Sequence, residues 1–404
     1  MKKFQRVLLF ILLFGTMLIF GLIENIKGVS YPLIKAEFSA SWEQQGFMVS
    51  MLALAYVGFS VIAGIFLGRF GIKPAFLMGY AAVCTGVFAV FFMPGFITAA
   101  AALFVLFAGF GFLEVGVNAL ASRVFVTRAA LLMNLLHSFY GVGAFLGPRA
   151  AGAIINNTNL GWRYVYLFSL PAALIFFIPS IFTRFSDNGT ETTDRDAADT
   201  GERRSFFDAL KSPMVWLMSI TLGLMIIVEM NNANWGPLYF KDVYGLNPSV
   251  EGAWFLSAFF LVFTLSRMIC GPLVERIGYI RALLGVAFIT LAIFITGFLM
   301  GEKGIYVLPA MGFFIALFWP TLMAVAIVIF GRDAPVFSSA MIAIGGLLNA
   351  AVQFLVGLTN KIFGAAWGYR SSLVYTVLLI AVLMLLYRKL KPRGDGKPAF
   401  GGSL

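Results

Sequence analysis

The sequence predicts an all-α membrane protein with twelve transmembrane helices in two six-helix bundles. Three observations favour this fold class. The composition is 60% hydrophobic and only 12% charged, apolar runs recur along the whole chain, and one polar segment divides those runs into two sets of six. Soluble domains do not have this balance of residues, and the mean hydropathy of +0.92 is typical of a chain that crosses a lipid bilayer.

Each apolar run is close to the length of about 20 residues that a helix needs to cross the hydrocarbon core. Backbone in contact with lipid must be helical or belong to a closed barrel, so these runs predict helices. The first run follows Lys2, Lys3 and Arg6. We expect a membrane helix there rather than a signal peptide, because the run is long, contains Glu24 and Lys27, and lacks a small-residue cleavage site. The expected helices lie at residues 7–30, 43–67, 74–93, 97–119, 131–157, 162–184, 213–240, 249–270, 280–300, 304–330, 333–359 and 367–389.

A polar and charged segment at residues 185–212 interrupts the apolar pattern. It is too polar to bury, and we expect it to form a cytoplasmic linker with a short helix near Phe206–Leu210. The linker separates an N-terminal six-helix bundle (1–184) from a C-terminal one (213–393). The polar, glycine-rich tail at 394–404 is expected to be disordered.

Most of the 29 lysines and arginines fall near the two ends of the chain and in alternate loops. Because positively charged loops stay on the cytoplasmic side, we expect a multi-pass protein of the cell membrane with both termini in the cytoplasm. This orientation explains the formal net charge of +11. The charge therefore requires no nucleic-acid partner, and the partner that the composition indicates is the lipid bilayer.

Residues that form common catalytic and metal sites are scarce. Cys84 and Cys270 lie in apolar runs and give neither a disulfide framework nor a metal spacing, and the single histidine, His137, excludes a multi-histidine site. The sequence has no P-loop, nucleophile elbow or dinucleotide fingerprint. We therefore expect no enzyme activity, metal or cofactor.

A loop motif occurs once in each half, as GIFLGRFGIK at residues 64–73 and GPLVERIGYIR at residues 271–281. Both copies place a glycine, an arginine and a second glycine at the same spacing and end with a basic residue, and only the second copy keeps an acid between the first glycine and the arginine. A plain positively charged inner loop is the alternative, but the repeated spacing favours a tight cytoplasmic turn that latches one conformation. The predicted latch residues are Arg69, Lys73, Glu275, Arg276 and Arg281.

This motif, the six-plus-six helices and the central linker together resemble the major facilitator superfamily over nearly the full chain. The resemblance implies a secondary transporter that works by alternating access on a small molecule. It does not name the substrate, because fold alone does not give function. We expect a monomer.

Three carboxylates lie inside apolar runs, away from the run ends: Glu24, Glu114 and Glu229. A carboxylate in hydrocarbon costs several kcal/mol unless it faces a cavity, finds a partner or takes up a proton. Lys27 follows Glu24 on the same helical face and can pair with it, either structurally or in function. Glu114 has no basic residue within a turn and shares a face with Asn118, so it favours proton coupling over a structural hydrogen bond.

The seventh run carries Glu229, Asn231, Asn232, Asn234 and Trp235 within a few residues and is expected to end near the following Gly-Pro pair. Amides and acids hydrogen-bond hydroxyl groups, and an indole stacks on a sugar ring. The alternative is that the amides hold neighbouring helices together. The density of polar groups favours a binding site.

The fifth run places Asn134, His137 and Tyr140 on one face. His137 is either a second titrating group or a packing residue. Gly143 and Gly147, ahead of Pro148, predict close helix packing and a kink. In the second half, Asn349 and Gln353 lie four residues apart and are further candidates for lining a cavity.

A closer resemblance comes from GFGFLEVGVN at residues 109–118 and LMNLLHSFYGVGA at residues 132–144, which look like the fucose/glucose:proton symporter branch. It implies sugar recognition and proton coupling at Glu114, and roles for Asn134 and for Glu229, Asn232 and Trp235. Gly28 stands where the fucose type has an aspartate. Asn25 matches an amide of that pattern, and Glu24, the acid beside it, is the candidate to replace the missing aspartate.

These observations favour proton-coupled uptake of a neutral sugar, a hexose or a related compound. The predicted coupling residues are Glu114, Glu24 and His137, although carboxylates and amides also suit Na⁺. Two alternatives remain open: a drug or metabolite:proton antiporter, which the glycine-proline pattern of the fifth run favours, and a lipid or lipid-linked-sugar flippase, in which Arg149 and Lys27 grip phosphate. The predicted substrate-binding residues are Asn25, Asn118, Asn134, Glu229, Asn231, Asn232, Trp235, Asn349 and Gln353.

Overall fold

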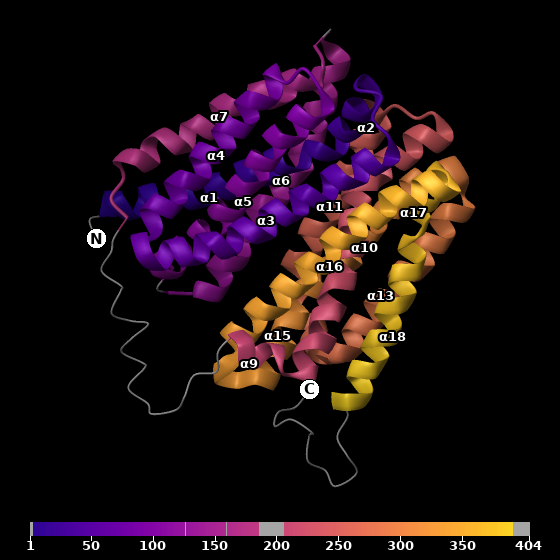
Figure 1. Cartoon of the computed structure of the whole chain (residues 1–404). Helices are drawn as coiled ribbons and strands as arrows, with labels where there is room; N and C mark the ends of the chain where they lie inside the picture. The colour runs from indigo at the N-terminus through magenta and orange to yellow at the C-terminus, as the bar shows by residue number, and fades with distance from the viewer. Residues whose placement is uncertain (1–2, 126, 159, 186–205, 391–404) are drawn as a thin grey trace. The chain divides into compact units, whose positions relative to one another are not determined.

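The computed structural model describes residues 3–125, 127–158, 160–185 and 206–390. These residues form helices and turns, and no strand occurs among them (Figure 1). The short helix predicted at the end of the linker is confirmed as α9 (Phe206–Leu210). The rest of the predicted linker up to residue 205 and the predicted disordered tail at 394–404 lie outside the described residues, apart from residue 185.

Within the described chain, ten stretches are long and apolar enough to cross a membrane. Each of the twelve predicted runs coincides with helical structure. One stretch, residues 301–363, contains two of those runs, and the run at 131–157 forms a long helix that is not among the ten. The twelve-helix prediction is therefore consistent with the helices observed.

The chain divides into two compact units. Unit 1 contains residues 1–41, 51–202 and 248–253. Its helices are α1 (Lys3–Asn25), α2 (Lys27–Glu37), most of α3 (Trp42–Phe70), α4 (Ile72–Phe92), α5 (Phe96–Val124), α6 (Ala129–Asn157), α7 (Trp162–Phe182) and the π-helical turn η1 (Pro248–Gly252).

Glycines set the closest packing in unit 1, where α1 lies against α6 and α4 against α5 (Figure 1). A Cβ atom on Gly21 of α1 would clash with the Tyr140 carbonyl of α6. One on Gly143 of α6 would clash with the Leu18 carbonyl of α1. Small residues allow membrane helices to approach this closely. The predicted close packing at Gly143 is thus confirmed, and it brings the end of α1 beside Tyr140.

Unit 2 contains residues 42–50, 203–247 and 254–404. Its long helix α10 packs on α16 and α18, and α13 also packs on α18. Its elements are α9, α10 (Pro213–Tyr244), most of α11 (Ala253–Ile269), α12 (Gly271–Ile277), α13 (Tyr279–Leu299), the 3₁₀ turns η2 (Gly301–Tyr306) and η3 (Leu308–Ala310), α14 (Met311–Ile315), α15 (Phe318–Phe330), the 3₁₀ turn η4 (Gly331–Asp333), α16 (Ala334–Phe363), α17 (Ala365–Arg370) and α18 (Ser372–Leu390).

The tenth predicted run is broken between α14 and α15. Pro320 has no N–H group, so the Ala316 carbonyl four residues earlier lacks its usual helical donor. The Arg267 Nε of α11 donates to that carbonyl at 3.4 Å, and its guanidinium lies 4.4 Å from the Phe263 ring centroid. A side chain from another helix therefore takes the place of the missing backbone donor.

The two copies of the loop motif have matching backbone conformations. Gly71 between α3 and α4 has a φ of 87°, and Gly278 between α12 and α13 has a φ of 89°. Residues other than glycine rarely adopt this backbone conformation, because their Cβ atom crowds the backbone. The repeat read from the sequence thus corresponds to the same tight turn in each unit.

Two expectations about helix ends were wrong. The seventh run does not end at Gly236-Pro237, because α10 continues to Tyr244 and is closed by Gly245 in the left-handed conformation. Proline has a helical φ angle, so a helix with tertiary support can accommodate it at the loss of one hydrogen bond. The first run extends beyond residue 30 to Glu37 and is interrupted at Ile26, between α1 and α2.

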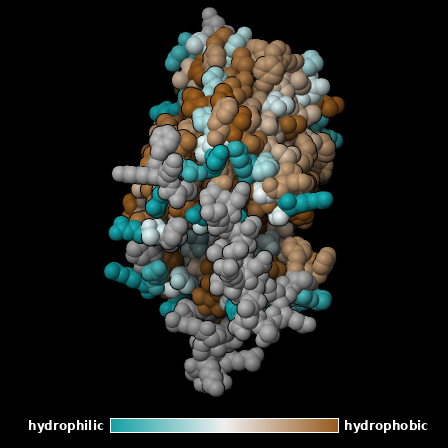
Figure 2. Space-filling view, turned by 90° about the vertical axis from the view of Figure 1, so that its left-hand side faces the viewer, coloured by the Kyte–Doolittle hydropathy of each residue, from teal (hydrophilic) through white to brown (hydrophobic). Residues whose placement is uncertain are grey.

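Large apolar side chains cover much of the surface, and brown and tan dominate the face shown in Figure 2. Ile97, Phe182 and Leu299 are 78%, 80% and 82% exposed. Extended apolar surface of this kind is unfavourable in water and marks contact with another apolar phase. These side chains fit a chain whose outer face meets lipid.

Candidate functional site

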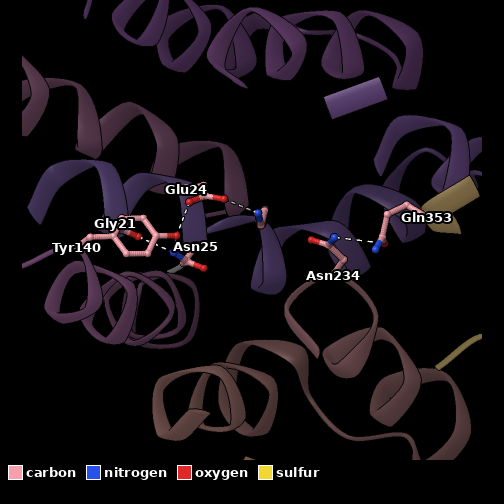
Figure 3. Close-up of polar contacts among 7 residues, drawn as sticks. Gly21, Glu24, Asn25, Tyr140, Asn234 and Gln353 are labelled. Carbon is pink, nitrogen blue, oxygen red and sulfur yellow. Dashed lines mark hydrogen bonds and ion pairs between the residues drawn. The ribbon is translucent and has the colours of Figure 1, made fainter. Parts of the chain in front are cut away.

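A buried charged cluster lies in unit 1 around Glu24. The Lys27 ammonium donates to Glu24 Oε1 at 2.8 Å, and the Tyr140 hydroxyl donates to Glu24 Oε2 at 2.5 Å (Figure 3). Glu24 is 9% exposed and Lys27 is 4% exposed. The predicted pairing of Glu24 with Lys27 is confirmed, and both oxygens of the carboxylate are engaged.

This cluster lies at the interruption at Ile26. Glu24 lies near the end of α1 and Lys27 begins α2, so their ion pair spans the break between the two helices. The Lys27 Nζ also lies 5.0 Å from the Phe107 ring centroid of α5, a favourable cation–π distance. Asn25 Nδ2 donates to the Gly21 carbonyl at 2.8 Å and to the Tyr140 hydroxyl at 3.5 Å (Figure 3).

Glu114 and Asn118 lie on α5, one turn apart and each half-buried. Glu114 makes no hydrogen bond or ion pair with any described residue. The Oδ1 atom of Asn118 is buried and likewise has no hydrogen-bond partner among the described residues. Buried polar atoms are normally paired, so this face of α5 has the capacity to bind a proton, a water molecule or a ligand.

Gln353 of α16 is the centre of a polar network in unit 2. Its Oε1 accepts from Trp235 Nε1 at 2.7 Å and from Asn234 Nδ2 at 3.3 Å. Its Nε2 donates to Asn231 Oδ1 at 3.2 Å and to Asn349 Oδ1 at 3.0 Å. The carboxamide therefore makes all four hydrogen bonds that its chemistry allows.

The network continues through α10 into other helices of unit 2. Asn231 Nδ2 donates to Ser372 Oγ at 3.0 Å. Asn232 Oδ1 accepts from the Tyr369 hydroxyl at 2.5 Å, and its Nδ2 lies 3.0 Å from Met311 Sδ. We refer to Asn231, Asn232, Asn234, Trp235, Asn349, Gln353, Tyr369 and Ser372 as the Gln353 cluster. Most of its polar atoms satisfy one another.

The remaining predicted binding and coupling residues differ in exposure. Asn134 is exposed on α6, while His137 and Glu229 are half-buried and each make contacts with other groups. Arg149 is exposed and forms no ion pair with a described residue. The binding and coupling roles of these residues therefore stay predictions.

The predicted latch residues have different environments. Lys73 donates to the Ile181 carbonyl at 2.6 Å and so caps the end of α7. The Arg69 guanidinium lies 5.5 Å from the Phe70 ring centroid. Glu275, Arg276 and Arg281 are exposed and form no ion pair with any other described residue.

The roles of Tyr140, Tyr369 and Ser372 were not predicted from the sequence. A signal existed for each, since all three are polar side chains within apolar runs. Their partners, however, lie more than a hundred positions away along the chain. Within the described ranges no group of three or more His, Cys, Asp or Glu side chains is placed to hold a metal ion.

Comparisons with known proteins agree with this architecture. The family model described as Major Facilitator Superfamily matches residues 12–352. Among curated proteins, Bypass of stop codon protein 6 of Saccharomyces cerevisiae is 22% identical over 286 residues, which cover 63% of this chain and 57% of that protein. The chain thus spans little more than half the length of this relative.

Solved transporter structures share the fold. A bacterial homologue of the human lysosomal transporter Spinster gives a TM-score of 0.76 at 16% identity, with 96% of this chain and 98% of that one covered. The fucose:proton symporter FucP of E. coli gives 0.65 at 16% identity, with 95% and 98% covered. These structures follow the fold of the chain nearly end to end. The family model covers most of the chain, so the chain belongs to the Major Facilitator Superfamily, a family of multi-pass membrane transporters rather than enzymes.

Proposed function

We propose that the chain is a secondary active transporter that uses proton entry to drive uptake of a neutral sugar by alternating access. The observation that carries this proposal is Glu114, a half-buried carboxyl group on a membrane helix with no partner among the described residues. A carboxyl group in such a place is expected to have a function. The similarity to a fucose:proton symporter supports this reading.

Glu114 and Glu24 have different parts in this proposal. Both Glu24 oxygens already accept hydrogen bonds, whereas Glu114 is free of described partners. Glu114 is therefore the main proton carrier. Glu24, in the same unit, responds to the protonation state of Glu114. The amides near these acids, Asn25 and Asn118, are the proposed sugar contacts of unit 1.

The antiporter alternative loses one of its arguments. Its support was the glycine pattern on α6, and Gly143 is accounted for by close packing against α1. One observation still supports the flippase alternative. The Arg149 guanidinium is exposed and forms no ion pair with any described residue. Lys27 does not add to it, because its ammonium is engaged by Glu24.

We further propose that the protein is a monomer of the cell membrane with both termini in the cytoplasm. The distribution of lysine and arginine supports this orientation. Labelling of single cysteines introduced near each terminus, in intact and in lysed cells, tests it. Labelling in intact cells would contradict it.

Uptake of labelled hexoses into proteoliposomes tests the proposed function. We expect an inward proton gradient to drive accumulation by the wild type. Glu114→Gln should abolish accumulation and leave sugar exchange, because the neutral side chain mimics the protonated state. Glu302→Gln, an exposed position outside the proposed site, is the matched control and should accumulate normally. Accumulation driven only by a sodium gradient would show that the coupling ion is sodium and not the proton. Accumulation by Glu114→Gln would show that Glu114 is not required for coupling.

A further inference from the structure

The hydrogen bonds around Gln353 fix which atoms of the Gln353 cluster accept and which donate. An indole N–H can only donate, so the Gln353 atom that faces Trp235 Nε1 is the carbonyl oxygen. That same oxygen lies 3.3 Å from the Asn234 carboxamide, which must therefore present its NH₂ group to it. The Oδ1 atom of Asn234 is consequently the one that points away from Gln353 (Figure 3).

This Oδ1 atom is an acceptor without a donor. It is buried, and it has no hydrogen-bond partner among the described residues. The other buried side-chain nitrogen and oxygen atoms of the Gln353 cluster all have partners. Asn234 is itself only 6% exposed and its NH₂ group is held by Gln353, so rotation of the carboxamide would put two oxygens face to face.

We propose that Asn234 Oδ1 is the substrate-binding atom of unit 2 and accepts a hydrogen bond from a hydroxyl group of the transported molecule. This inference rests on the proposed function and specifies the chemistry of its substrate. An acceptor takes a hydroxyl or amine donor and disfavours a carboxylate or phosphate oxygen. The site thus selects a polyol such as a sugar over an anion.

The rest of the Gln353 cluster then has a positioning role. Gln353 orients Asn234, and Trp235 fixes the orientation of Gln353. Asn231 and Asn349 anchor the other end of the Gln353 carboxamide. These side chains engage one another, so their loss would disturb the site without removing a contact to one particular substrate group.

A cycle that changes the protein and the sugar separately tests this assignment. Affinity for a hexose and for each of its deoxy analogues is measured calorimetrically on purified wild type, Asn234→Ala and Asn349→Ala. For one hydroxyl position we expect the deoxy analogue to bind the wild type about tenfold more weakly, as for the loss of one hydrogen bond. Asn234→Ala should bind the parent about tenfold more weakly and no longer distinguish the two sugars.

Asn349→Ala is the matched control, because it removes an amide whose Oδ1 is already occupied by Gln353. It should weaken parent and analogue equally and so keep the tenfold discrimination. Discrimination that survives in Asn234→Ala at every position would overturn the inference and leave sugar binding intact. Failure of the folded wild type to bind any sugar would overturn the proposed function together with the inference.

Wild-type protein alone provides a second test that does not depend on a variant folding. Fluorine can accept a weak hydrogen bond but cannot donate one. At the hydroxyl that donates to Asn234 Oδ1, the deoxyfluoro analogue should therefore bind as weakly as the deoxy analogue. Recovery of affinity by fluorine at every position would contradict a donating hydroxyl and overturn the assignment.

Discussion

Glu24 and Lys27 form an ion pair of 2.8 Å across the break between α1 and α2, with both side chains almost fully removed from the surface. Removing one partner of a buried pair leaves an uncompensated charge, at a cost of about 3–5 kcal/mol. Glu24→Gln or Lys27→Met should therefore lower the apparent free energy of unfolding by roughly that amount. Denaturant unfolding in detergent measures the loss.

The double variant Glu24→Gln/Lys27→Met should lose less than the sum of the two single losses, because it leaves neither charge alone. The exposed pair Lys211–Asp208, with the same spacing, is the matched control and should show a coupling of less than about 1 kcal/mol. Additive losses at Glu24 and Lys27 would show that the two charges are not coupled in the folded protein.

Tyr140 supplies the second donor to the Glu24 carboxylate. Tyr140→Phe keeps the ring and removes the hydroxyl, so one carboxylate oxygen loses a charge-assisted hydrogen bond worth about 1.5–3 kcal/mol. We expect lower thermal stability and a changed pH profile of transport. Tyr164→Phe, also in unit 1, is the control and should change neither the thermal stability nor the pH profile. An unchanged pH profile in Tyr140→Phe would show that the Tyr140 hydroxyl has no part in proton coupling.

The positions of the helices were predictable from the sequence because lipid leaves the backbone few alternatives. Long apolar runs marked all twelve segments, and the repeated glycine spacing anticipated the matching turns at Gly71 and Gly278. The pairing of Glu24 with Lys27 followed from local helix geometry. Each of these features depends on residues that are close in sequence.

Contacts between distant helices were not predictable in this way. The bond from Tyr140 to Glu24 depends on how α1 and α6 approach, and a single sequence does not give that register. The saturation of Gln353 depends in the same way on the packing of α10 against α16. The seventh helix was expected to end near Gly236-Pro237, by residue 240, but it continues to Tyr244.

The Arg267 side chain compensates for the missing backbone donor at Pro320. Arg267→Met should destabilise unit 2, since an unpaired buried carbonyl costs about 1–3 kcal/mol. Pro320→Ala supplies a backbone N–H group that can donate to the Ala316 carbonyl. The Arg267→Met substitution should therefore cost less stability in the Pro320→Ala background. Equal costs in both backgrounds, measured by thermal unfolding, would show that Arg267 does not serve this carbonyl.

Gln353 makes four hydrogen bonds, and Gln353→Leu leaves several buried groups without partners, including Trp235 Nε1. We expect a loss of more than about 3 kcal/mol, since each unsatisfied group costs about 1–3 kcal/mol. Thr359→Val, on the same helix and half-buried, should stay within about 1 kcal/mol of the wild type. A Gln353→Leu protein as stable as the control would contradict the network.

The central claim is that Glu114 carries the proton that drives sugar uptake. Its most direct test is the internal pH of proteoliposomes containing a pH-sensitive dye, held at zero membrane potential, as hexoses are added one at a time. The account predicts that one hexose acidifies the interior of wild-type and Glu302→Gln vesicles and has no effect in Glu114→Gln vesicles. Acidification that persists in Glu114→Gln, or a wild type that takes up the sugar without any proton movement, would contradict it.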